Sequence, residues 1–108
     1  MFGGPFFPQY GKGQTVTTGA ASASITIPTG NQSVRIQNTS ATNGCFIRIG
    51  NSANGTVVAS GTSPNADVFI GPNTYMTLSK ALLDDTVAYI QSGGTAVLWI
   101  IPGEGGLL

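Results

Sequence analysis

Apolar and polar residues alternate in short runs along most of the chain, a pattern typical of β-strands that have one buried face. In the runs at 34–37 and 45–49, this alternation places Val34, Ile36 and Ile47 on the inner face. A weaker run at 56–59 predicts an edge strand, so the chain has eight or nine strands in all. The stronger runs predict strands at 14–18, 24–27, 34–37, 45–49, 67–70, 75–78, 87–91 and 96–101.

Clusters of Gly, Pro, Asn and Ser separate these runs and predict the turns. Residues 71–73 (GPN) have the composition of a tight turn, and residues 92–94 (SGG) predict a short hairpin between the last two strands. Pro102 and the glycines after it predict the end of the last strand. The helix-forming residues at 79–85 are too few for more than one helical turn, so we expect a short connection there.

Strands at this spacing, with no helices between them, predict an all-β fold: a single-domain antiparallel β-sandwich. An immunoglobulin-like sandwich is disfavoured, because Cys45 is the single cysteine and Trp99 lies in the last strand. We therefore expect a jelly-roll-like fold. We divide the chain into an extended N-terminal arm rich in Gly, Pro and aromatic residues (1–13), a β-sandwich domain (14–102) and a C-terminal tail (103–108).

The charge content narrows the classes of function. Only 7% of the residues are charged, with four Lys or Arg, four Asp or Glu, no His and a formal net charge of zero. The lack of His removes the commonest general base and the commonest zinc ligand. A neutral chain without a Lys/Arg cluster is poorly suited to nucleic acid. We therefore expect a protein that is not an enzyme, with no catalytic residues, no cofactor, no metal site and no nucleic-acid partner.

Two features of the sequence could carry chemistry, and we interpret both as structural. Cys45 shares a strand face with Ile47 and no His exists to activate it, so we expect a buried thiol, with an intermolecular disulfide as the minor alternative. Asp84 and Asp85 are the only adjacent carboxylates, and they lack the spacing of a calcium loop or of a glycosidase pair. We predict a solvated turn there.

The uncharged polar residues favour a surface that packs against other protein. Ser, Thr, Asn and Gln make up 34 of the 108 residues, and a net charge near zero promotes association. A secreted β domain with a Thr- and Asn-rich surface is the alternative. No apolar run approaches the roughly 20 residues of a membrane helix, and the first residues lack the basic and apolar regions of an export signal. We expect no membrane partner.

The two ends of the chain carry apolar residues that we predict to bind partners. Glycines and prolines interrupt the N-terminal arm, so neither a helix nor a regular ladder is expected there. The arm either folds back over an open edge of its own sandwich or reaches a neighbouring subunit as an anchor. We predict the second. The predicted partner-binding residues are Phe2, Phe6, Phe7, Tyr10, Leu107 and Leu108.

Several segments together resemble the small capsid decoration, or cement, proteins of tailed bacteriophages. The resemblance runs from about residue 14 to 105, and the arm and the connection at 80–85 are not part of it. No single segment is diagnostic, but their order and spacing are moderately specific. The segments are QTVTT at 14–18, ASITIP at 23–28, VRIQNT at 34–39, CFIRIGN at 45–51 and TAVLWIIPGEG at 95–105.

This resemblance implies a structural virion protein made in the host bacterial cytoplasm. Such a protein binds the outer surface of the capsid and stabilises it by bridging subunits of the major capsid protein. Its partners are the major capsid protein and copies of itself, as a trimer or dimer on a local symmetry axis. Two alternatives stay open: a tail, fibre or head-fibre base component of the virion, and a carbohydrate-binding sandwich that aids host adhesion through exposed aromatic residues such as Phe46 and Trp99.

Overall fold

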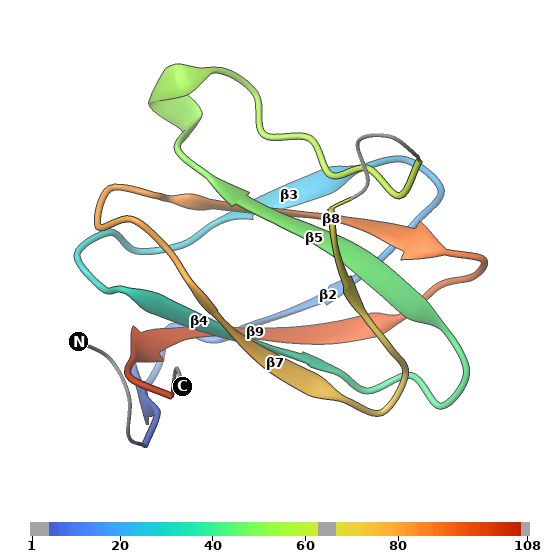
Figure 1. Cartoon of the computed structure of the whole chain (residues 1–108), viewed down its shortest axis with the longest axis horizontal. Coiled ribbons are helices and arrows are strands. Elements are labelled where there is room, and N and C mark those ends of the chain that lie inside the picture. The colour runs from blue at the N-terminus through green and yellow to red at the C-terminus, as the bar shows by residue number, and fades with distance from the viewer. Residues whose placement is uncertain (1–4, 63–66, 107–108) are drawn as a thin grey trace.

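The computed structural model describes residues 5–62 and 67–106, and these residues form two antiparallel β-sheets stacked as a sandwich (Figure 1). The prediction of an all-β sandwich is confirmed. A single short 3-10 turn, η1 (Ser52–Asn54), is the helical element of this described part. Sheet A contains β1 (Phe7–Pro8), β2 (Gln14–Thr17), β4 (Ser33–Asn38), β7 (Tyr75–Ser79) and β9 (Val97–Glu104). Sheet B contains β3 (Ala23–Thr26), β5 (Gly44–Gly50), β6 (Val68–Ile70) and β8 (Thr86–Ser92).

The strand order defines a jelly roll. Sheet A runs β2, β9, β4, β7 and sheet B runs β3, β8, β5, β6, with β1 added beside β9. The pairings are nested: β5 pairs with β6, β4 with β7, β3 with β8 and β2 with β9. The chain is therefore one long hairpin rolled up into two layers.

The core lies between the two sheets and is built from alternate residues of each strand. Ile36 of β4, Ile47 of β5 and Ile100 of β9 are at most 1% exposed, as the alternation predicts. Each such side chain contributes about 1.5–3 kcal/mol by leaving water. Cys45 belongs to this core as a free thiol, and burial raises its pKa to about 11.

Two connections differ from the sequence prediction. Residues 56–59 form no strand; they belong to the long β5–β6 connection, which crosses the outside of sheet B. The SGG segment at 92–94 does turn the chain, but β8 lies in sheet B and β9 in sheet A. It therefore links the two layers and does not form a hairpin. Alternation marks a strand but does not say which sheet the strand joins.

The last strand does not end before Pro102, because β9 continues to Glu104. The Pro102 carbonyl accepts the N–H of Gln9 at 2.8 Å, so the main-chain polar side of Pro102 faces away from β4. Val34 of β4 lies opposite Pro102, and this pair does not need the N–H that proline lacks. Proline is tolerated in a strand at such a position. The sandwich therefore extends past residue 102.

The N-terminal arm also forms a regular pair, which the sequence did not predict. Phe7 lies opposite Glu104 and Pro8 opposite Gly103, so β1 continues the edge that β2 forms along β9. Residues 9–13 loop out between the two strands, with Gly11 at φ +80° in their turn. The described part of the arm therefore lies on its own sandwich, at the lower left of Figure 1.

Candidate functional site

The outer face of sheet B is covered by the chain itself. Residues 51–62, which follow β5, run along the side of this sheet that faces away from sheet A (Figure 1). A Cβ atom on Gly50 would overlap Val57, and one on Gly61 would overlap the Phe46 ring, so glycine lets this segment pack closely. Ala88 points outward beside Arg48 yet is fully buried. We name residues 51–62 and Asp67 the covering segment.

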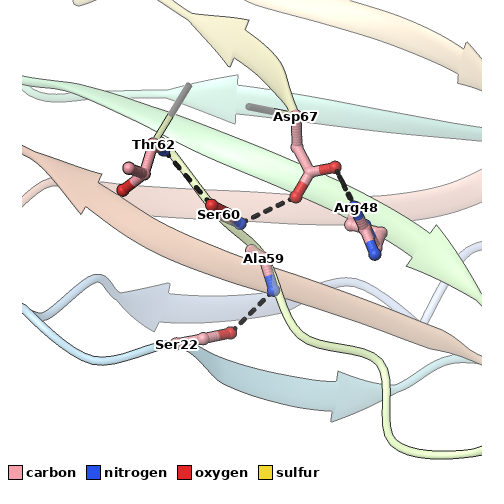
Figure 2. Close-up of polar contacts among 6 residues, drawn as sticks. All are labelled: Ser22, Arg48, Ala59, Ser60, Thr62 and Asp67. Carbon is pink, nitrogen blue, oxygen red and sulfur yellow. Dashed lines mark hydrogen bonds and ion pairs between the residues drawn. The ribbon is translucent and has the colours of Figure 1, made fainter. Parts of the chain in front are cut away.

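Hydrogen bonds fix the covering segment at Ala59 and Ser60 (Figure 2). Ser22 Oγ accepts the N–H of Ala59 at 2.9 Å, and Asp67 accepts the N–H of Ser60 at 2.7 Å. Asp67 also pairs with Arg48, whose nitrogen atoms lie 2.8 Å from Oδ1. These polar contacts hold the covering segment on this face, where Phe69 of β6 is still 49% exposed.

The outer face of sheet A, in contrast, is bare and apolar at its centre. Tyr75 is 62% exposed, Trp99 is 50% exposed and Val97 is 39% exposed. Trp99 and Tyr75 stand opposite Gln37 on its two sides, so they form one row across β9, β4 and β7. The two aromatic residues are two strand spacings apart, roughly 9–10 Å. The row is a flat platform with an amide between two rings.

Arg35 is the single charged residue on the outward positions of β2, β4, β7 and β9, all of which are fully described. Its guanidinium lies 4.6 Å from the ring centres of both Phe6 and Tyr75, and its Nε donates to Thr77 Oγ1 at 3.1 Å. The charge is thus held between two aromatic faces. The remainder of the face offers aromatic, aliphatic, hydroxyl and amide groups to a partner.

The predicted partner-binding residues divide into three groups. Phe2, Leu107 and Leu108 lie outside the described residues. Phe6 is half-buried, packed over Arg35 and against Gly103 of its own chain. Phe7 and Tyr10 are 64% and 88% exposed. The structure therefore brings Phe6 to the edge of the bare face and leaves Phe7 and Tyr10 open to solvent.

The ionisable groups are arranged as structural contacts. Asp85 accepts the N–H of Ser52 at 2.9 Å and its hydroxyl at 2.8 Å, and these bonds lower the pKa of Asp85. Burial lowers the pKa of Lys80, whose amino group donates to the carbonyl of Asp84 at 2.9 Å. Within the described ranges, no three His, Cys, Asp or Glu residues gather as metal ligands.

From the sequence, partner binding was predicted at the chain ends and Trp99 was considered only for carbohydrate binding, so the row that it forms with Gln37 and Tyr75 was not predicted. The signal was present, because Trp99 occupies an outward position in the alternation of the last strand. What was missing was the position of β9 in the middle of sheet A.

Comparisons of the chain with protein-family models, with curated proteins and with solved structures found no match. No helix among the described residues has the length and apolar character needed to cross a membrane.

Proposed function

We propose that this protein is a non-enzymatic structural component of a tailed-phage virion that binds the outer surface of the capsid and stabilises it. The observation that supports this proposal is the outer face of sheet A, with its exposed Trp99, Tyr75 and Val97. Buried aromatic residues dominate the energetics of protein interfaces, and charged residues are depleted at interface centres. The resemblance at residues 14–105 supplies the partner, which is the major capsid protein.

The mechanism is bridging by many copies. Each copy that lays this face across a boundary between neighbouring capsid subunits removes apolar area from water on both of them. Many such contacts on one shell act together, so a modest individual affinity gives a large total stabilisation.

Replacing the central tryptophan tests this function. The Trp99→Ala variant should rebind to capsids stripped of the protein about 30-fold more weakly, as expected for loss of an interface anchor worth about 2 kcal/mol. The Leu83→Ala variant removes a residue that is 69% exposed away from this face and should bind as the unmodified protein does. Binding is measured by co-sedimentation with the stripped capsids.

Two results would contradict the proposal. One is equal binding by the Trp99→Ala and Leu83→Ala variants. The other is a copy number per particle, from gel densitometry of virions, far below that of the major capsid protein, which would indicate a tail or fibre component instead.

A second candidate function is supported by the same row of residues. Two aromatic rings on either side of the Gln37 amide form a platform on which a sugar ring can stack and accept a hydrogen bond. On a glycan array, this function requires binding that is lost in Trp99→Ala with the fold intact, as judged by circular dichroism. Absence of glycan binding by the unmodified protein would remove this candidate.

A further inference from the structure

One edge of the sandwich keeps its main-chain polar groups free. The Thr74 carbonyl accepts the N–H of Asn38, and the Lys80 N–H donates to the carbonyl of Gln32. Because the hydrogen-bonding side alternates along an antiparallel strand, the even-numbered residues of β7 face β4. Tyr75, Thr77 and Ser79 therefore direct their N–H and C=O groups outward, where β7 has no neighbouring strand among the described residues.

The other edges of the two sheets are interrupted, short or partly occupied. The β1–β2 edge carries Pro8 and is broken by the loop at 9–13. On β3, the Thr26 carbonyl accepts the Gln14 side chain at 2.8 Å. The three-residue β6 is preceded by Asp67, whose main chain and side chain bond to Ser60 of the covering segment. The edge of β7 is uninterrupted over five residues and has no strand beside it among the described residues, although Gly106 lies against the Thr77 side chain on the outer face.

The side chains at this edge expose the flank of the core. Met76 of β7 points inward but is 36% exposed, and Val68 of β6 is 41% exposed. Between the two edge strands lies a shallow cleft of about 330 Å³, with Leu78 and Ile47 on its apolar side and the Arg48–Asp67 ion pair on its polar side. An additional strand beside β7 would cover this apolar flank.

We propose that β7 is a homodimerisation edge, at which a second copy of this chain pairs its own β7 antiparallel about Thr77. In this register, Thr77 lies opposite Thr77 of the second copy, and Tyr75 lies opposite Ser79. All three are the residues with outward N–H and C=O groups, so each opposed pair is a hydrogen-bonded pair. One shift by a single residue would oppose inward-facing and outward-facing side chains and lose this match.

The side chains of β7 favour a second copy as the occupant. Met76 comes opposite Leu78 of the second copy on the inner side, which continues the apolar flank from one core to the next. The Thr77 pair on the outer side is a favourable cross-strand contact. β7 carries no charged residue and no proline, the devices that protect edges from self-pairing. Such a contact is isologous and closes as a two-fold dimer.

The dimer turns the outer faces of both sheets A to the same side, because an antiparallel pair has its two-fold axis perpendicular to the sheet. The Trp99 rows of the two copies would then form one continuous platform. Dimerisation through β7 does not require that the platform binds a capsid, so the dimer can be tested independently of capsid binding.

The test removes one outward N–H from the edge. In Ser79→Pro the lost N–H is one that does not bond to β4, so the fold should persist, whereas the dimer loses one hydrogen bond from each copy. Ser79→Ala keeps the N–H and is the matched control. By sedimentation velocity we expect a dimer for the unmodified protein and for Ser79→Ala, and a monomer for Ser79→Pro with an unchanged circular dichroism spectrum.

A cysteine at the centre of the pair reports the register directly. In an antiparallel hydrogen-bonded pair the Cα atoms are about 5.5 Å apart, within disulfide range. Oxidised Thr77→Cys should therefore form a disulfide-linked dimer, whereas Thr15→Cys, exposed on the β2 edge, should remain monomeric on a non-reducing gel. The native Cys45 does not compete because it is fully buried.

Three results would overturn the inference. They are a monomeric unmodified protein, a dimer that persists in Ser79→Pro, and disulfide linkage that is equal at positions 77 and 15. If the protein is monomeric but still rebinds to stripped capsids, the dimer fails and the proposed function stands. If the protein is a dimer but does not bind stripped capsids, the proposed function fails and the dimer stands.

Discussion

Asp85 shows how one carboxylate can stabilise two connections at once. Its Oδ1 accepts the Ser52 N–H and the Thr86 hydroxyl, and its Oδ2 accepts the Ser52 hydroxyl. It therefore ties the start of η1 to the start of β8. The sequence predicted a solvated turn at Asp84 and Asp85. In the structure, Asp85 also holds the start of the covering segment through its bonds to Ser52.

Stability in acid should depend on Asp85. Because its pKa is lowered in the folded state, its contribution is complete above the ordinary carboxyl pKa and is lost as the pH falls through the folded-state value. We expect Asp85→Asn to be less stable than the unmodified protein at neutral pH and to lose less stability on acidification. The measurement is the free energy of unfolding in urea as a function of pH.

The Asp84→Asn variant is the control, since it makes the same charge change one residue away and its carboxylate bonds to Ala81 on its own turn. If both variants flatten the acid side of the profile equally, the effect comes from net charge and not from the bonds to Ser52.

The alternation of single residues was the most predictable feature. Val34, Ile36 and Ile47 face the core because the side-chain period of a strand is two, whatever its neighbours are. Buried polar residues could not be inferred in this way. Asn38 is 1% exposed and donates to the carbonyl of Asn43 in the following loop and to that of Ile70, which comes near it only when sheet B packs on sheet A.

At the scale of elements, the arm and the covering segment are held on the sandwich by close packing at glycines and not by long strand pairings. β1 has two residues, and its contact with β9 depends on Gly103, where a Cβ atom would overlap the Phe7 carbonyl and the Phe6 ring. The two-residue pairing of β1 with β9 cannot be predicted from the Gly- and Pro-rich sequence of the arm, because it depends on the space that Gly103 leaves on β9.

Replacing this glycine should release the arm. We expect Gly103→Ala to cost about 1–3 kcal/mol through overpacking and to expose the chain near Phe7 to limited proteolysis. The measurements are the free energy of unfolding and the rate of cleavage within residues 5–13. Gly19→Ala is the control, since a Cβ atom there would meet nothing within 4 Å. Equal cleavage of the two variants would mean that the arm is not held at Gly103.

For the molecule as a whole, the sandwich class followed from strand spacing, whereas the difference between its two outer faces did not. One face is bare at its centre and the other is covered because of where residues 51–62 run, and that path depends on close packing at Gly50 and Gly61. The weak strand pattern at 56–59 reflects Val57 and Ala59 packing onto a sheet from outside. A segment that packs on the outside of a sheet can show the same alternation of apolar and polar residues as a strand that pairs within the sheet.

The nested pairing also bears on the time at which the protein folds during synthesis. β9 is the last strand, yet it lies between β2 and β4 and carries the fully buried Leu98 and Ile100. Until β9 has left the ribosome, β2 has no strand beside it and sheet A lacks the strand that joins β2 to β4. The N-terminal strands must therefore wait as an open, apolar intermediate, at translation speeds of about 5–20 residues per second.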